Sequence, residues 1–374
     1  IDSYLGNKDE LKLNLLLKQL PTFYYDELSP NINLDEQFRK KLSISFKASN
    51  EFEKFLLEIF NDYLPISFLE GYSKLEKEVE KKSWPSNPKT IFTSHFLLQK
   101  TIPSLYTALK TSKNQCKLIH GQHGGAFGQL EHMWHEEHEK KISDYYLNWG
   151  WESSEKSVPI GIIKPITQFL KINKKNKNKE KLLLVTRTQP LYSNELLDTR
   201  FRSSEMVGHI NECQNFISNL NSEIRKDNLI LRLHAKKYGW NEYERFQSNY
   251  PEINIDKGES KITKLLLKTK LCVFTYNATG YLETFASRIP TIIFWNTKEN
   301  ILREETNYYF EILKKNNIFF DDPIKASKHI NFIWKNIDEW WNSSNIQDAI
   351  NTFCLKYSKI NKNKVNEIKE ILLI

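Results

Sequence analysis

The stretch Ile119-His-Gly-Gln-His-Gly-Gly-Ala-Phe-Gly128 follows a short apolar run that begins at Cys116 and precedes a polar segment compatible with a helix. This order predicts a strand that is joined to a helix by a glycine-rich turn. Glycines there let the backbone approach a ligand closely, and a helix start offers free N–H groups to an anion. His123 adds a group that transfers protons near neutral pH. The glycines by themselves are explained more simply by a tight turn that binds no ligand. Residues elsewhere in the chain must therefore show whether the turn belongs to a binding site.

Strand and helix signals alternate on both sides of this turn. In the first half we expect strands at 90–93, 117–119 and 145–147 and helices at 11–20, 52–63, 75–82, 98–109 and 130–142. In the second half we expect strands at 182–186, 229–233, 253–255, 271–274 and 291–294 and helices at 204–226, 241–248, 260–269, 280–287 and 324–373. Such alternation predicts βαβ units and parallel sheets, hence an α/β fold.

The polar run 171–181 divides the chain, because it has too few apolar side chains to bury a face. A chain of 374 residues also exceeds one ordinary core. We expect a Rossmann-like domain over 1–165 with a helical N-terminal part, a second one over 180–340 and a helical extension over 341–374. Ligands of such sheets bind beyond the carboxyl ends of the strands, so the expected site is a cleft between the domains.

The composition, 40% hydrophobic and 27% charged, is that of a soluble globular protein. The chain contains neither an apolar run of about 18 residues nor a signal-peptide pattern. Its four cysteines are widely spaced, which favours a reducing, cytoplasmic location. The net charge of +8 fits nucleic acid, an anionic membrane surface or a phosphorylated substrate alike.

In the first half, polar residues stand where strands are expected to end. His95 follows one such strand, and Gln122 and His123 follow the next. In the segment after them, Glu131 or Glu137 is the expected carboxylate of the cleft. The histidines of that segment step by three and do not match H-E-x-x-H, so we expect no metal site.

In the second half, Arg232 and His234 alternate along one strand and share a face near its carboxyl end. There they are suited to a phosphate, although a solvated edge strand would carry the same residues. Arg187 follows a neighbouring strand. The run Tyr276-Asn277-Ala278-Thr279-Gly280 ends an apolar strand and opens a helix, which makes it an anion cradle. Glu283, in the first helical turn, either binds a ribose diol or favours the helix dipole.

Several common enzyme classes are disfavoured. The sequence lacks G-x-G-x-x-G and G-x-x-x-x-G-K-[ST], the phosphate loops of Rossmann dehydrogenases and P-loop NTPases. It also lacks the G-x-S-x-G elbow of α/β-hydrolases.

The segment from Ile91 to Trp151 resembles the sugar transferases of bacterial O-antigen and surface-polysaccharide biosynthesis. The resemblance rests on Gln122-His123-Gly124-Gly125 with Gly128, on Asp144-Tyr-Tyr-Leu-Asn-Trp-Gly-Trp151 and, further along, on Arg232-Leu233-His234, Tyr238-Gly239-Trp240 and Thr279-Gly280 with Glu283. It covers residues 90–295, and it departs from the family pattern at Ala126-Phe127, where a tyrosine hydroxyl is absent. It implies a GT-B architecture, with two Rossmann-like domains, the donor nucleotide on the C-terminal one and the acceptor mainly on the N-terminal one.

More distantly, the chain is similar to retaining CMP-Kdo transferases of capsule and O-antigen assembly. That similarity implies a site without metal or further cofactor. It assigns the CMP group to a set of C-terminal residues: Arg187, Arg232, His234, Tyr276, Asn277, Thr279, Gly280 and Glu283. It assigns catalysis to His123, Gln122, Glu131 and Glu137, and the acceptor cleft to His95, Gly124, Gly125 and Lys236.

The favoured hypothesis is a metal-independent glycosyltransferase. It would move a sugar from a nucleotide donor, CMP-Kdo or a related CMP-ulosonic acid, to a cell-surface glycan or its lipid-linked precursor. We expect a cytoplasmic enzyme in peripheral contact with the inner membrane face, without a nucleic-acid partner. The alternatives are a GT-B transferase for NDP-hexoses, a CDP-polyol phosphotransferase of teichoic-acid type and a non-enzymatic binder of anionic polymers.

Overall fold

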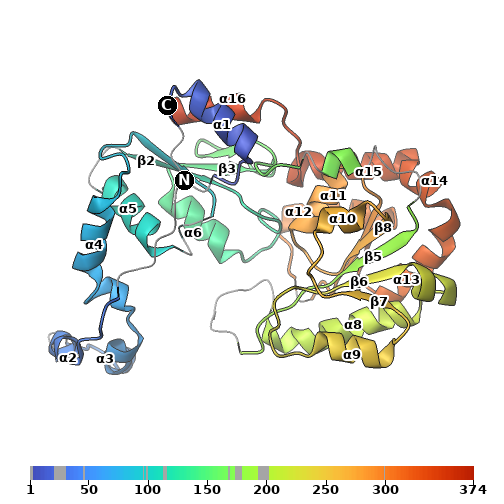
Figure 1. Cartoon of the computed structure of the whole chain (residues 1–374), viewed down its shortest axis with the longest axis horizontal. Coiled ribbons are helices and arrows are strands. Elements are labelled where there is room, and N and C mark those ends of the chain that lie inside the picture. The colour runs from blue at the N-terminus through green and yellow to red at the C-terminus, as the bar shows by residue number, and fades with distance from the viewer. Residues whose placement is uncertain are drawn as a thin grey trace.

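The computed structural model describes residues 3–20, 31–44, 47–95, 97, 100–112, 116–166, 169–172, 179–192, 202–298 and 300–374, with the backbone alone at 43, 44 and 61. These residues form two α/β lobes that lie side by side (Figure 1). We call them the N-lobe, built on strands β1–β4, and the C-lobe, built on strands β5–β10.

The N-lobe sheet has four parallel strands in the order β1-β2-β3-β4. Its strands are short and mostly buried, as expected of parallel strands covered on both faces. Their bounds are β1 Thr90–Thr93, β2 Lys117–Gly121, β3 Tyr145–Asn148 and β4 Ser157–Pro159. The carboxyl ends of β1 and β2 carry His95, Gln122 and His123, so one edge of the sheet collects these side chains.

The C-lobe sheet has six parallel strands in the order β10-β9-β8-β5-β6-β7. This is the doubly wound Rossmann order, whose crevice for ligands opens where the order reverses, here between β5 and β8. The bounds are β5 Lys181–Val185, β6 Leu229–Arg232, β7 Asn254–Asp256, β8 Thr269–Phe274, β9 Thr291–Phe294 and β10 Phe319–Phe320. Two parallel-sheet lobes confirm the α/β fold of GT-B type that we expected from the sequence.

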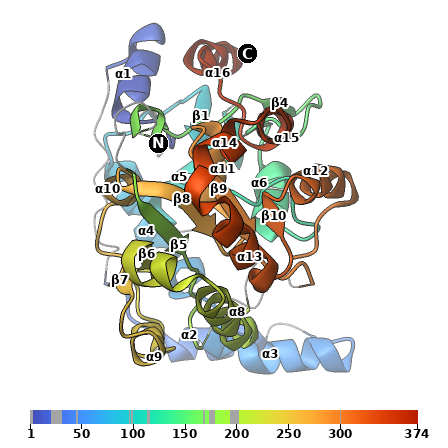
Figure 2. The same ribbon diagram turned by 90° about the vertical axis from the view of Figure 1, so that its right-hand side faces the viewer.

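Helices pack around the strands of the C-lobe sheet (Figure 2). Those of the N-lobe part are α1 Asn7–Leu16, α2 Glu36–Ile44, α3 Glu51–Tyr63, α4 Tyr72–Lys81, α5 Thr101–Ser112 and α6 Trp134–Ile142. The later ones are α8 Met206–Ser218, α9 Glu242–Asn249, α10 Ile262–Leu266, α11 Thr279–Ala286, α12 Glu304–Lys315, α13 Pro323–Ile333, α14 Ile337–Asn342, α15 Ser344–Tyr357 and α16 Lys364–Leu373. Short 3-10 turns span Ile66–Phe68, Ser203–Glu205 and Trp334–Asn336, and a π-helical turn spans Ile224–Asn228.

Several expected bounds are corrected. The helix expected at 130–142 begins only at Trp134, because residues 128–131 bond to the C-lobe instead. The helix expected at 204–226 ends at Ser218, and the one expected at 324–373 is four separate helices. Strands β4 and β10 and helices α2 and α12 were not expected. Of the expected linker 171–181, residues 173–178 lie outside the described residues, and Lys181 already begins β5.

The C-terminal part is divided between the lobes. Phe353 and Tyr357 of α15 pack in the C-lobe core. Helix α16 crosses back, and its Val365 and Ile368 pack in the N-lobe core with β-strand residues such as Ile119. The expected extension 341–374 is therefore not one unit.

The two lobes also share a core. Phe127, Trp149 and Trp151 of the N-lobe belong to the same buried cluster as Tyr281 and Phe285 of α11. All four cysteines are reduced and buried. Among the described residues no helix combines the length and the apolarity needed to cross a bilayer.

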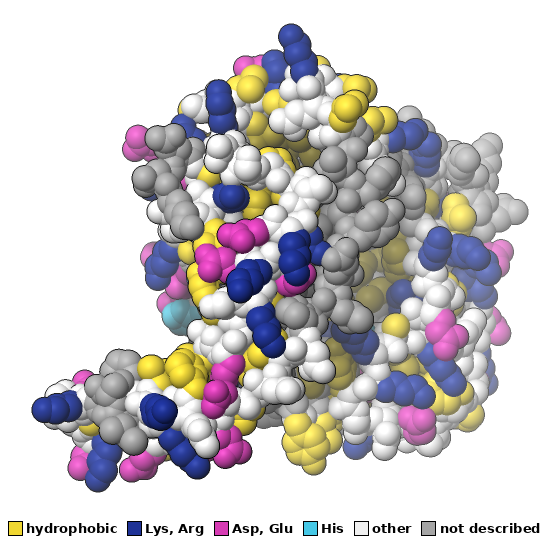
Figure 3. Space-filling view, turned by 60° about the vertical axis from the view of Figure 1, so that its left-hand side comes forward, with side chains coloured by type: hydrophobic (Ala, Val, Ile, Leu, Met, Phe, Trp, Pro, Cys, Tyr) yellow, Lys and Arg dark blue, Asp and Glu magenta, His cyan; other side chains and the backbone are white. Residues whose placement is uncertain are grey.

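Helices α2 and α3 project from the N-lobe (Figures 1 and 3). They are tied to it by the buried ion pair between Arg39 Nε and Glu70 Oε1, 2.6 Å long, which lowers the pKa of Glu70 to about 2. The apolar stripe of α3 stays open to solvent, with Phe52 67% and Phe55 53% exposed.

Candidate functional site

The glycine-rich turn of the N-lobe touches the first residues of α11 in the C-lobe. Gly125 N donates a hydrogen bond of 2.9 Å to Thr279 Oγ1. A Cβ atom at Gly125 would lie 2.4 Å from the carbonyl carbon of Ala278, so only glycine fits there. The expected turn and the expected anion cradle, which are 154 residues apart in the chain, therefore meet.

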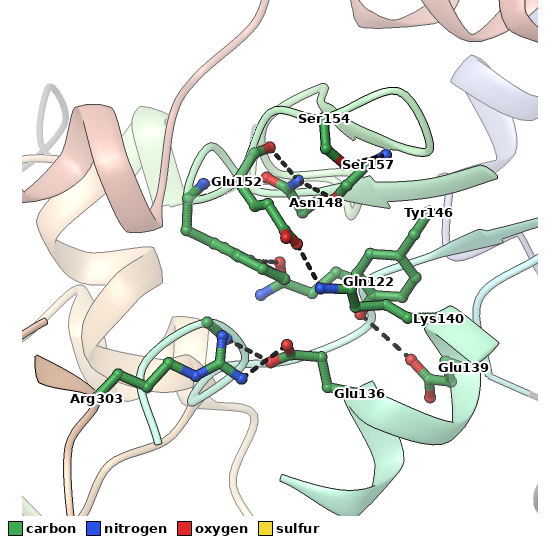
Figure 4. A network of polar contacts seen from close by, with 12 residues as sticks. Gln122, Glu136, Glu139, Lys140, Tyr146, Asn148, Glu152, Ser154, Ser157 and Arg303 are labelled. Atoms are coloured by element: carbon green, nitrogen blue, oxygen red, sulfur yellow. Dashed lines mark hydrogen bonds and ion pairs between the residues drawn. The ribbon is translucent and has the colours of Figure 1, made fainter. Parts of the chain in front are cut away.

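Gln122 fixes the turn to the Trp149-Gly150-Trp151 segment (Figure 4). Its Oε1 accepts hydrogen bonds from Trp149 N (2.9 Å) and Trp151 Nε1 (2.7 Å), and its Nε2 donates to Gly124 O (2.7 Å). The side chain is buried. These bonds occupy both ends of the amide, so Gln122 holds the turn in place, although its position in the sequence predicts a catalytic group.

A second polar tie joins the lobes through Glu136 (Figure 4). Its Oε2 accepts from Gly128 N (2.7 Å), and its Oε1 lies 2.8 Å from Arg303 Nη2. The Arg303 Nε donates to Leu130 O at 2.9 Å. A buried carboxylate stabilises a fold only when its oxygens are bonded in this way.

Glu139, one helical turn further along α6, lies between two histidines. Its Oε1 is 3.5 Å from His123 Nδ1, and its Oε2 is 3.4 Å from His120 Nδ1. The Tyr146 hydroxyl donates to Oε2 at 3.3 Å. His123 has an 18% exposed side chain, whereas those of His120 and Glu139 are 1% exposed. Of the two imidazoles, only His123 is thus open to a substrate.

Burial governs the protonation of the groups behind His123. It lowers the pKa of His120 to about 3, with smaller contributions from His138 and His95. It also raises the pKa of the Tyr146 hydroxyl well above its ordinary value. Both groups are therefore neutral at neutral pH, and the pair to consider is His123 with Glu139.

The carboxylates of this helix differ from those expected. Glu131 and Glu137 are exposed, whereas Glu136 and Glu139 are buried. The signal in the sequence is the three-residue step from the buried Met133 through Glu136 to Glu139, which places these side chains near one face of the helix.

Beyond His123 the N-lobe site continues to His95, whose ring centroid lies 5.0 Å from that of His123. Gly124 lies against Thr279, since a Cβ there would be 3.3 Å from Thr279 Oγ1. The structure thus brings three of the residues expected in the acceptor cleft, His95, Gly124 and Gly125, together with the expected catalytic His123. The fourth, Lys236, lies in the exposed segment after β6 instead.

On the C-lobe side, the residues at the reversal point are buried. Arg187 follows β5, with its Nη2 3.4 Å from Glu205 Oε2. Asn277, after β8, is fully buried, and its Nδ2 has no hydrogen-bond partner in the described parts of the chain. The Tyr281 hydroxyl lies 3.1 Å from Asn277 Oδ1 and 2.7 Å from Gln129 Oε1.

Further expected donor residues surround the start of α11. Thr279 and Gly280 form its first turn, and a Cβ at Gly280 would strike the ring of Phe274 at 2.4 Å. Tyr276 is partly buried against the shared core. Glu283 Oε1 lies 2.5 Å from Lys164 Nζ of the N-lobe, so its carboxylate forms an ion pair across the lobes. Its burial raises the pKa of Glu283, an effect that Lys164 opposes.

The end of β6 differs. Arg232 Nη1 is held by Asp256 Oδ1 (2.9 Å) and by Ser260 O (2.8 Å). His234 is exposed, and its Nδ1 accepts from the backbone N of Lys236, also exposed. In the order β6-β5-β8 this end lies two strands from the start of α11, or about 10 Å at the usual strand spacing.

No cluster of three or more His, Cys, Asp or Glu side chains among the described residues could hold a metal ion.

The sequence model of the LIC12162 family transferase matches residues 1–372, so this chain belongs to that family of transferases. No curated protein matches the sequence. Among solved structures, the wall teichoic acid polymerase TagF aligns with a TM-score of 0.41 and 12% identity over 98% of this chain and 96% of its own. Anabaena HepE in complex with UDP and glucose gives a TM-score of 0.46 and 9% identity over 87% and 90%, and Acinetobacter baumannii MurG gives 0.43 and 9% over 81% and 77%.

Proposed function

We propose that this transferase moves a sugar from a nucleotide-activated donor to a hydroxyl group of a glycan. The observation that supports it most is the 2.9 Å contact between Gly125 and Thr279, which sets the turn that carries His123 against the start of α11. That helix start offers backbone N–H groups and a positive dipole end to an anion. A proton acceptor and an anion cradle next to each other are what transfer from a nucleoside phosphate requires.

In the proposed reaction, His123 takes the proton of the acceptor hydroxyl. Glu139 orients the imidazole through Nδ1; the separation of 3.5 Å would shorten to a hydrogen bond once substrate is bound. The acceptor oxygen then bonds to the anomeric carbon, and the bond from that carbon to the phosphate oxygen breaks. The nucleotide leaves with the electron pair, and its phosphate is stabilised by the α11 amides, Asn277 and Arg187.

The finer assignment is a CMP-linked ulosonic acid as donor and a cell-surface glycan or its lipid-linked precursor as acceptor. This donor follows from the resemblance of the sequence motifs alone. A lipid-linked acceptor would bring the protein into peripheral contact with a membrane.

A thermal-shift screen with CMP, CDP, UMP, UDP and GDP tests the proposal, since a ligand that binds only the folded state raises its stability. We expect a CMP-selective rise in the unfolding temperature, reduced by Asn277→Ala and unchanged by Tyr308→Ala, a control on α12. A shift with UDP or GDP alone would replace the ulosonic donor by a hexose donor. A shift with none of the five nucleotides would overturn the proposed function. A product that contains a phosphodiester instead of a glycosidic bond would also overturn it, and would identify a polyol phosphotransferase.

A further inference from the structure

The N-terminal segment Ser3–Gly6 crosses the carboxyl end of β1 and is fixed on both sides of Tyr4. Ser94 Oγ donates to Ser3 O at 2.9 Å, and Ser3 is buried. Leu5 packs in the N-lobe core. A Cβ at Gly6 would lie 2.8 Å from Pro165 Cγ, so the backbone runs directly against that ring. The position of Tyr4 is thus set by its neighbours.

Tyr4 has a left-handed backbone, with φ of +63°. Bulky residues rarely adopt this conformation, because the side chain crowds its own backbone. Such strain persists where surrounding contacts hold it, and it gathers at functional sites. Here the fixed neighbours Ser3, Leu5 and Gly6 hold the strained backbone of Tyr4, and this conformation sets the direction of its ring.

That ring faces the candidate site. Its centroid lies 6.1 Å from the ring of His95 and 6.3 Å from that of His123. Lys164 Nζ lies 5.7 Å above the ring while pairing with Glu283 of the C-lobe. Tyr4 is only partly buried, so part of its surface is open beside these polar groups.

We infer that Tyr4 is a substrate-contacting residue whose ring forms an aromatic wall for a sugar ring on the acceptor side of the site. A pyranose presents apolar C–H faces and a rim of hydroxyls. The Tyr4 ring can pack against an apolar face of the sugar, and His95 and Lys164 can form hydrogen bonds with its hydroxyl groups. Tyrosine gives a large, rigid contact surface at a low entropy cost. The inference rests on the proposed function and deepens it by naming the side from which the acceptor is held.

The kinetic test compares Tyr4→Ala with Tyr4→Phe, which keeps the ring, and with Tyr308→Ala, which alters an exposed tyrosine away from the site. We expect Tyr4→Ala to raise the KM for acceptor about tenfold and to leave the KM for the donor within about twofold. Tyr4→Phe and Tyr308→Ala should stay near the parent value for both. An unchanged acceptor KM in Tyr4→Ala, or an equal rise in both KM values, would overturn the inference.

A binding test separates this inference from the proposed function. Saturation-transfer NMR with methyl β-D-galactopyranoside and methyl α-D-mannopyranoside at millimolar concentration reports contact with a sugar ring without any nucleotide. We expect signals for the parent chain and for Tyr4→Phe, and their loss in Tyr4→Ala at an unchanged unfolding temperature. Signals that survive in Tyr4→Ala, or that are absent from the parent chain, overturn the role of Tyr4. The nucleotide screen is unaffected by either result and judges the transferase proposal by itself.

Discussion

The carboxyl ends of β8 and β6 look alike in sequence and differ in the folded protein. Each follows an apolar strand with polar residues suited to a phosphate. At β8, Asn277 is buried beside the start of a helix, and Thr279 contacts the other lobe. At β6, Arg232 is already held by Asp256, and His234 points into solvent. Residue type therefore identifies candidates for binding, and tertiary partners decide which of them remain available.

The sharpest test of this difference replaces one histidine from each region. His123→Ala removes the proposed base and should lower kcat/KM by about 10²–10⁴-fold. His234→Ala, in the exposed β6 loop, should lower it less than about threefold. Steady-state kinetics on both variants, with unfolding temperatures as the control for folding, measure the contrast. Equal losses would place the β6 end in the reaction and contradict the difference between the β8 and β6 ends.

The next effect concerns the pair between Lys164 and Glu283. Lys164→Met leaves a buried carboxylate without its partner and should lower the free energy of unfolding by about 3 kcal/mol. The double variant with Glu283→Gln removes the stranded charge and should regain most of that loss. Urea unfolding of both variants checks this. A double variant as unstable as the single one would mean that packing of the Lys164 stem, not its charge, is what matters.

A smaller effect is expected at the contact between the lobes. Gly125→Ala drives a methyl group into the backbone of Ala278 and should cost about 2 kcal/mol, together with much of the activity. Gly124→Ala is the matched control, since its added methyl would meet side chains instead of backbone, Thr279 Oγ1 at 3.3 Å and Phe127 Cε2 at 3.9 Å, and it should cost less than about 1 kcal/mol. Denaturant titrations compare the two. Equal losses in the free energy of unfolding for the two variants would mean that Gly125 does not pack closely against the start of α11.

The last effect, similar in size to that of Gly125→Ala, is the response of stability to pH. The pKa of His120 is about 3 in the folded chain, against about 6.5 when unfolded, so between these values the unfolded chain binds more protons. Stability therefore falls as the pH drops below about 6.5, by about 2 kcal/mol between pH 7 and pH 5. Glu283, whose pKa is raised, acts with the opposite sign near its own range. The measurement is thus the slope of the free energy of unfolding against pH, compared between the parent chain and His120→Asn. Equal slopes would contradict the lowered pKa of His120.

Much of the fold could be predicted, because apolar strands of four to six residues that alternate with helices leave strong local patterns. The strands at 90–93 and 291–294 were located to the residue. The short strands β4 and β10 could not be, since three and two residues carry almost no periodicity. The start of α6 was misplaced because the preceding residues bond to a segment far along the chain. Local patterns do not contain that information.

The sequence predicts two pieces of the candidate site, the glycine-rich turn after β2 and the anion cradle at the start of α11. It does not predict the contacts that these pieces make. Glycines and small polar residues after a strand mark both pieces by themselves. The bonds of Gln122 to Trp149 and Trp151, the pairing of Glu283 with Lys164 and the approach of Tyr4 all join residues more than 20 positions apart. The sequence does contain one further signal for the site: the three-residue spacing of Glu136 and Glu139, which indicates that both carboxylates lie near the buried face of α6.

The return of α16 to the N-lobe has a consequence for biosynthesis. Val365 and Ile368 fill the core that Phe92 and Ile119 begin, and Thr90 Oγ1 donates to Leu372 O. The half of the molecule that leaves the ribosome first thus waits for the whole stretch between Pro159 of β4 and Lys364 of α16 to be synthesised before its interior is closed. Until then its sheet exposes an apolar face, so a nascent chain stalled before α16 should be the species that chaperones hold.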